Sequence, residues 1–196
     1  MADQIDDVDG RVLSVATRFF AELGYDATPL NLIAEAVGTD AERSSLLQAG
    51  RKQELYHSVL AHLYDLELAH MEAAAREAPD GIAGLHLLVD AFMDFITEHP
   101  ETPAIWWHRV LNDAADLRFP EMELPPPFLK VITENPRWGT GPEMDLDVVS
   151  WTIMWSMTAF VNDGFFNPSG IGRPAAYRPP LDRFRAQLHH IVDRLA

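Results

Sequence analysis

Two pairs of acidic and imidazole side chains have the spacing of a metal-ligating motif. Glu54 precedes His57, and Glu67 precedes His70, with the Glu-x-x-His spacing of di-iron carboxylate proteins. A di-iron site needs such pairs on facing helices, together with two further carboxylates. Both pairs fall on one predicted helix, so we expect no metal site.

Other catalytic signatures are missing from the sequence. The chain has no cysteine, which excludes disulfides, thiolate metal sites and cysteine nucleophiles. It has no Gly-rich phosphate loop, nucleophile elbow or His-Glu-x-x-His zinc motif. His189 and His190 are adjacent and point in different directions, so a solvated surface is expected for them. The sequence indicates a binding protein rather than an enzyme, with no catalytic residue and no cofactor.

The composition is typical of a globular protein. Of the 196 residues, 47% are hydrophobic and 23% are charged. The acidic N-terminal stretch lacks the basic flank and apolar core of a signal peptide. No run reaches the roughly 18 uninterrupted apolar residues of a membrane helix. We therefore expect a cytoplasmic protein with no membrane partner.

Apolar residues recur at steps of three and four through the N-terminal part of the chain, which predicts helices. Thr28 is expected as an N-cap with Pro29 as the first helical residue, and Thr39 as the start of a capping box. Glycines are expected to end the first three helices. The predicted helices are 12–23, 28–38, 39–50 and 51–76.

The C-terminal part also shows helical periodicity, interrupted by prolines. Residues 100–103, 118–144 and 167–180 are expected to be irregular, apart from one short helix, and no strand is expected. The predicted helices are 82–99, 104–114, 128–134, 145–165 and 181–195. The sequence thus predicts an all-α protein of about nine helices.

Three short helices followed by a long one, with a glycine-centred turn between the second and third, are typical of a helix-turn-helix. Residues 1–50 are therefore predicted to form a three-helix DNA-binding domain. Residues 51–196 are predicted to form a helical ligand-binding and dimerisation domain, with 51–76 as the connecting helix.

The amino-acid sequence of the N-terminal segment resembles the signature of a known family. RVLSVATRFFAELGYDAT at 11–28 and LIAEAVG at 32–38 closely resemble the start of TetR-family transcriptional regulators, without a gap from Val12 to Gly38. Residues 50–55, GRKQEL, are similar to the family's Gly-Ser-Lys-Glu-Glu-Leu start of helix four. The resemblance implies a dimeric regulator that binds a double-stranded DNA operator and responds to a ligand.

Residues 40–49 depart from the family pattern. The stretch is one residue longer than usual, an acidic residue replaces the usual lysine, and the tyrosine is missing whether the register is anchored on Thr39 or on Gly50. If this helix enters a major groove, the candidate contacts are Arg43, Ser44 and Ser45. A recognition helix kept only as scaffold is the alternative.

Four further residues match family positions that contact the DNA backbone, where helix N-termini meet phosphates. They are Thr28, Pro29, Arg51 and Lys52. Capping for Thr28 and a solvated charge for Lys52 are the competing interpretations.

Charge opposes DNA binding, because Lys and Arg supply most of the affinity for phosphates. The net charge is −15, and residues 1–60 alone carry ten acidic and five basic side chains, a net −5. This favours a second hypothesis, in which a TetR-like homodimer has lost DNA binding and acts as a ligand- or protein-binding module.

Aromatic residues and methionines gather in the C-terminal two-thirds, where they predict a pliable cavity for a small apolar ligand. Core packing is the alternative for each of them. The candidate ligand-binding residues are Tyr64, Phe92, Phe95, Trp106, Trp107, His108, Trp151, Met154 and Trp155.

The resemblance implies a homodimer formed by the last two long helices, 145–165 and 181–195. The first of these is apolar nearly all round, more than one intrachain contact needs. The favoured function is a ligand-responsive transcriptional regulator that acts as a repressor.

Overall fold

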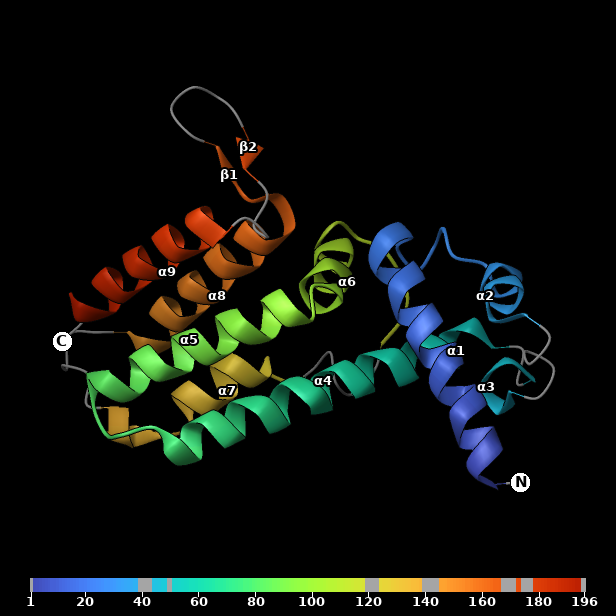
Figure 1. Ribbon diagram of the computed structural model, residues 1–196, viewed down its shortest axis with the longest axis horizontal. Coiled ribbons are helices and arrows are strands. Elements are labelled where there is room, and N and C mark those ends of the chain that lie inside the picture. The colour runs from blue at the N-terminus through green and yellow to red at the C-terminus, as the bar shows by residue number, and fades with distance from the viewer. Residues whose placement is uncertain are drawn as a thin grey trace. The chain divides into compact units, whose positions relative to one another are not determined.

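The computed structural model describes residues 2–38, 44–48, 51–118, 124–138, 145–166, 172–173 and 178–194. Within these ranges it has nine α-helices and one short 3-10 helix, which confirms the predicted all-α class (Figure 1). The described part also contains two short strands, β1 (Phe165–Phe166) and β2 (Gly172–Arg173), paired antiparallel. The expectation of no strand was wrong here, because two residues are too few to show an alternating pattern.

The chain packs into two compact units. The first contains 1–63 and 104–124, and the second contains 64–103 and 125–196. Residues 51–63 and 104–124 thus pack with the N-terminal residues, so the units do not follow the predicted boundary after residue 50. The functional division into 1–50 and 51–196 stays a prediction.

The first unit is built on an apolar core that α1, α2 and the start of α4 share. Its buried members include Val12, Phe20, Ile33, Leu55 and Val59. The predicted end of the first helix at Gly24 is confirmed, since this residue has φ +81°, a conformation that glycine adopts readily. The helices of this unit are α1 (Ala2–Leu23), α2 (Leu30–Val37), α3 (Ser45–Gln48), the beginning of α4 (Lys52–Glu77) and most of α6 (Glu101–Val110).

Helix α6 begins earlier than expected. Residues 100–103 were predicted to interrupt the helix, but only His99 and Pro100 do so. Pro103 lies in the first turn of α6, where the missing N–H would have no helical partner in any case. The helix ends at Val110, earlier than the predicted 114, and the following turn contains two residues of positive φ, Asn112 and Ala114.

The second unit is organised around α5, which contacts α7, α8 and α9. Its buried face carries Leu88, Phe92 and Met93, and α8 and α9 lie side by side, joined by the stacked rings of Phe160 and Phe184 (Figure 1). No helix in the described ranges is both long and apolar enough to cross a bilayer. The helices of this unit are the remainder of α4, α5 (Ile82–Glu98), α7 (Pro127–Thr133), η3 (Pro136–Trp138), α8 (Leu146–Asp163) and α9 (Arg178–Asp193).

A glycine fixes η3 against the start of α5. A Cβ added to Gly84 would lie 2.1 Å from the backbone carbonyl oxygen of Pro79 and 2.5 Å from the ring of the buried Trp138. The N–H of Gly81 donates to the carbonyl of Arg137 at 2.9 Å. Only glycine at position 84 permits this approach, which holds Arg137 at a defined place beside α4 and α7.

Candidate nucleic-acid interface and ligand pockets

Helices α2 and α3 pack against α1 as the second and third helices of a helix-turn-helix. The third helix starts later than predicted: Ser44 is not helical, and α3 begins at Ser45 rather than at the expected Thr39 cap. Ser44 itself is the N-cap, since its Oγ accepts the N–H of Leu47 at 3.3 Å. Residues 39–43, which include the proposed DNA contact Arg43, lie outside the described residues.

The two candidate serines are held by a carboxylate of α1. Asp9 accepts hydrogen bonds from Ser44 Oγ at 2.7 Å, from the Ser45 N–H at 3.0 Å and from Ser45 Oγ. Partial burial opposes ionisation of Asp9, but these bonds outweigh it and hold its pKa below the usual value. Ser44 is fully buried, so a contact between it and DNA would require the bond to Asp9 to break.

Thr28 does not cap α2 as expected. Pro29 occupies the N-cap position and helix α2 begins at Leu30. Thr28 is fully buried, and its hydroxyl donates to the carbonyls of Gly24 at 2.7 Å and Phe19 at 3.3 Å. The hydroxyl therefore satisfies carbonyls at the end of α1, while Pro29 is exposed at the start of α2.

Arg51 and Lys52 stand at the start of α4. Lys52 Nζ donates to the carbonyl of Tyr25 at 2.7 Å and lies 4.0 Å from the centre of its ring. The same carbonyl accepts the N–H of Thr28, so the structure brings these two predicted residues together around Tyr25. Arg51 is exposed and pairs with Glu54 at 2.9 Å, a contact of the kind worth roughly 0.2–1 kcal/mol. Arg51 can therefore exchange this partner for a phosphate at little cost.

Six of the predicted ligand-binding residues lie in the second unit. Phe92, Phe95 and Met154 are buried in its core, and Phe92 stacks on Phe128 at 4.5 Å. Three others differ in exposure: Tyr64 is buried, Trp155 is half-buried and Trp151 is 46% exposed.

The remaining three belong to the first unit, on α6, and so fall in a different compact unit from the other six. Trp106, Trp107 and His108 are all half-buried. His108 Nε2 lies 3.0 Å from the carbonyl of Ala21, which ties α6 to α1. Whether any of the nine residues touches a ligand stays a prediction.

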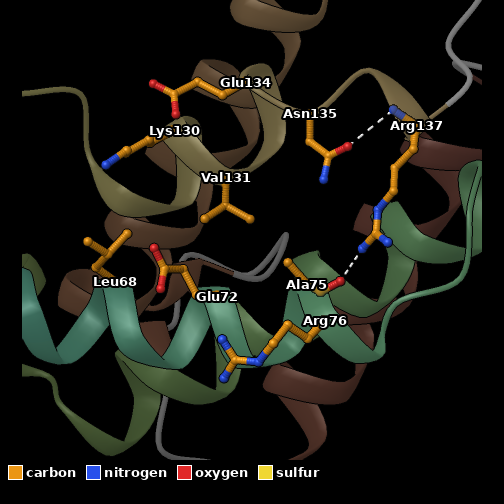
Figure 2. Close-up of a pocket in the computed structure, with 9 residues that line it drawn as sticks. All are labelled: Leu68, Glu72, Ala75, Arg76, Lys130, Val131, Glu134, Asn135 and Arg137. Carbon is orange, nitrogen blue, oxygen red and sulfur yellow. Dashed lines mark hydrogen bonds between the residues drawn. The ribbon is translucent and has the colours of Figure 1, made fainter.

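A pocket of about 460 Å³ lies between α4, α7 and η3, and none of the predicted ligand residues lines it. Figure 2 shows Glu72 on α4 below the pocket, Lys130 and Val131 on α7 above it, and Asn135 and Arg137 on the right. Sequence reasoning missed this site, because its residues are scattered among polar positions of three elements. The signal that could have found it is that Arg76, Lys130 and Arg137 are the only Lys or Arg residues of this unit before residue 164.

Glu67 was also missed, since it was considered only as part of a metal motif. It is 5% exposed, and its Oε1 accepts the N–H of Phe128, in the first turn of α7, at 3.2 Å. Burial raises the pKa of Glu67 to about 7, against the opposing effect of that hydrogen bond. A carboxyl group that titrates near neutrality thus links α4 to α7 inside the second unit. In the described part of the chain, no group of three or more potential ligands is placed to hold a metal ion.

Solved structures identify the fold, although the sequence matches no protein-family model and no curated protein. The ketosteroid transcriptional regulator KstR2 of Mycobacterium tuberculosis matches 96% of this chain and 94% of its own, with TM-score 0.70 and 20% identity. The TetR-family transcriptional regulator PfmR from Thermus thermophilus matches 93% of each chain, with TM-score 0.59 and 18% identity. The chain has the TetR-regulator fold. A TetR-family regulator from Chloroflexus aurantiacus also matches, over 97% of this chain and 92% of its own, with TM-score 0.57 and 18% identity.

In this TetR-regulator fold the two last long helices leave an apolar surface. Val148 and Trp151 on α8, and Ile191 on α9, are exposed. The rings of Trp151 and Trp155 meet edge to face at 5.7 Å, which orients both side chains. These residues lie within the segments predicted to form the dimer interface.

A polar network joins α9 to α5. Asp90 accepts from Arg185 at 3.0 Å and from His189 at 2.8 Å, and the ring of His189 stacks on that of His86 at 4.5 Å. The expectation of a solvated His189 was wrong in part, because this half-buried ring contacts Asp90 and His86 of α5. His190 is exposed as expected.

Proposed function

We propose that this protein is a cytoplasmic, homodimeric transcriptional regulator of the TetR type that binds a DNA operator as a repressor and responds to a small apolar ligand. The observation that supports it is the match of nearly the whole chain to solved transcriptional regulators. The helix-turn-helix of α2 and α3 supplies the element that such a regulator places in a major groove.

For DNA binding we propose contacts from the starts of α2, α3 and α4. Pro29 and Arg51 are exposed, and helix N-termini favour phosphates. Ser45, together with Arg43, would face base edges or phosphates. Thr28, Ser44 and Lys52 would act mainly by holding these turns in place, since each already has an intramolecular partner.

Titration of the protein against genomic DNA fragments at several salt concentrations tests this proposal. Selected fragments should bind, with affinity falling steeply as salt rises. Arg51→Gln should reduce the slope of log affinity against log salt by about one. Arg194→Gln, the same charge change at the end of α9, should leave the slope unchanged. If no DNA fragment binds at the lowest salt concentration, the proposal of DNA binding is refuted.

The second candidate is a TetR-like homodimer without DNA affinity that binds a ligand or a protein. The specific observation in its favour is Asp9, a carboxylate bonded to both serines at the start of α3. Asp9→Asn separates the two functions. If the helix-turn-helix binds DNA, this variant should bind DNA more tightly than the wild type, because one negative charge is removed from beside the candidate contacts. If neither protein binds DNA, the second function stands.

For the ligand we propose an apolar molecule held among the aromatic and methionine side chains of the second unit, with an effect on DNA affinity of about 1–3 kcal/mol. Helix α4 contributes residues to both units, so it offers a covalent route for the response. A thermal-shift screen with apolar probes tests this. Trp155→Ala should alter the ligand-induced change in melting temperature, and Leu111→Ala, at an exposed position, should not. If both variants show the same ligand-induced change, the assignment of the ligand to the aromatic residues is wrong.

For the dimer we propose an interface on α8 and α9, supported by the exposed Val148, Trp151 and Ile191. Sedimentation of the wild type should show a dimer, and Trp151→Asp should shift it towards the monomer. Leu124→Asp, at an exposed apolar residue on neither helix, is the matched control. A monomeric wild type would contradict the proposal.

A further inference from the structure

Three basic residues of the second unit line one pocket, and the five other arginines of this unit all follow residue 163. Between residues 64 and 163, the parts of the chain that belong to this unit contain only Arg76, Lys130 and Arg137 as Lys or Arg. All three line the pocket between α4, α7 and η3, although they come from three different elements (Figure 2). In a chain of net charge −15 this is a local region of positive charge.

These cations are poorly neutralised by the protein itself. Among the described residues, neither Arg76 nor Lys130 forms an ion pair or a side-chain hydrogen bond. Arg137 donates to the carbonyl of Ala75, but its buried Nε makes no hydrogen bond and has only Asp80 at 3.9 Å. The guanidinium is held over the ring of Trp138 at 4.6 Å. The pocket thus presents a fixed arginine and two adjustable cations.

The rest of the lining limits what the cations can bind. Glu72 and Glu134 reduce the net charge of the lining residues to +1, and Asp80 beside Arg137 reduces the local charge further, which favours one negative charge on a ligand over two. The side-chain amide of Asn135 can donate a further hydrogen bond. Leu68, Ala75 and Val131 provide an apolar surface. The volume of about 460 Å³ falls within the roughly 300–1,000 Å³ of small-molecule sites.

We propose that this pocket binds a small organic monocarboxylate with an apolar body. The carboxylate lies among Arg76, Lys130 and Arg137, and the body lies against Leu68 and Val131. None of the pocket residues belongs to the aromatic set proposed for the apolar ligand, and the site requires no DNA binding. It is therefore a second ligand site that can be tested separately from the regulator function.

The test is calorimetric titration of the full chain with 2-naphthoate, with 2-naphthamide as a neutral control of the same shape. Naphthoate should bind and naphthamide should bind at least about fivefold more weakly, because the amide lacks the charge that the cations attract. Affinity for naphthoate should fall as salt is added. Equal binding of the two probes, or no binding of either, would overturn the proposal.

Variants then place the site. Arg76→Gln and Lys130→Gln should each weaken naphthoate binding by about threefold to fivefold, as expected for charge contacts that solvent can reach. Glu134→Gln should strengthen it by about twofold, since a repulsive carboxylate is removed. Arg194→Gln, outside the pocket, should change nothing. Unchanged affinity in the two cation variants would show that the carboxylate binds elsewhere and would overturn the assignment.

Discussion

Replacing Glu67 by glutamine is expected to stabilise the folded protein at neutral and alkaline pH. The side chain is 5% exposed, and burial raises its pKa from 4.5 to about 7. A carboxyl group whose pKa is higher in the folded than in the unfolded chain binds its proton more tightly when folded. Its contribution to stability is therefore complete below about pH 4.5, and it is lost progressively as the pH rises from there to about 7.

The magnitude follows from the difference between the two pKa values. One pKa unit corresponds to about 1.4 kcal/mol, so ionised Glu67 lowers the free energy of unfolding by about 3 kcal/mol compared with a neutral side chain. At pH 5 Glu67 is protonated in the folded chain and only partly ionised in the unfolded chain, so the difference is about 1 kcal/mol. Glutamine has nearly the same shape and keeps an oxygen for the N–H of Phe128.

Urea unfolding followed by tryptophan fluorescence at pH 5, 6, 7 and 8 measures this difference. The advantage of Glu67→Gln over the wild type should grow from about 1 kcal/mol to about 3 kcal/mol across this range. Glu77→Gln, at an exposed position of the same helix, should show no such growth. An advantage that stays constant with pH, or a wild type that gains on the variant as pH rises, would refute the reasoning from burial.

Three further substitutions test contacts inside the individual units, and each effect is measured as a change in the free energy of unfolding. Gly84→Ala should destabilise by about 1–3 kcal/mol, because the new Cβ would lie 2.1 Å from the carbonyl oxygen of Pro79 and 2.5 Å from the ring of Trp138. Asp113→Ala should cost about 2 kcal/mol, since its carboxylate accepts two backbone N–H groups, including that of Tyr25 at 2.6 Å. Asp90→Ala should cost about 1 kcal/mol and less at high salt, because it removes the acceptor shared by an arginine and a histidine of α9.

Matched control substitutions at positions without these contacts separate the loss of a contact from the general effect of the residue change. Gly10→Ala lies in α1 with nothing within 4 Å of the added Cβ, so it should stabilise by up to about 1 kcal/mol. Asp116→Ala and Asp182→Ala remove exposed carboxylates of the two units and should change stability by less than about 0.5 kcal/mol. If a control costs as much as its partner variant, the contact assigned to that variant is not the cause.

The caps show where local sequence rules gave the wrong answer. Thr28 followed by Pro29 has the pattern of an N-cap, yet its hydroxyl donates back to the carbonyl of Gly24. The Thr39 capping box predicted the start of the third helix, yet α3 begins at Ser45 beside Asp9 of α1. Thr28 and Ser44 are small polar side chains with several possible partners. The packing of α1 decides among them, and the local sequence does not contain that information.

The site residues were predictable only in part. Phe92, Phe95 and Met154 were predicted to line a ligand cavity, with core packing as the alternative, and they are buried in the core of the second unit. Their spacing could not tell a core from a ligand cavity, because both bury the same side chains. Trp106 and Phe92 fall in different compact units, a division that no local pattern marks.

The sequence alone determined the order of the helices and the all-α class, because the helical repeat of apolar residues and the breaks at glycine and proline follow from the residues along the chain. Thus α4, α5 and α7 begin and end within a residue of the predicted bounds. The sequence did not determine every bound: α1 begins at Ala2 and not at residue 12, and α3 and α6 are shorter than predicted or shifted. The tertiary structure alone decided which side chains from distant segments meet. It buried Glu67 beneath α7, turned His189 onto α5, and gathered Arg76, Lys130 and Arg137 around one pocket. Which side chains are buried, and which lie close together, depends on how the helices pack. Helix packing requires two complementary segments, so the sequence of one segment does not determine it.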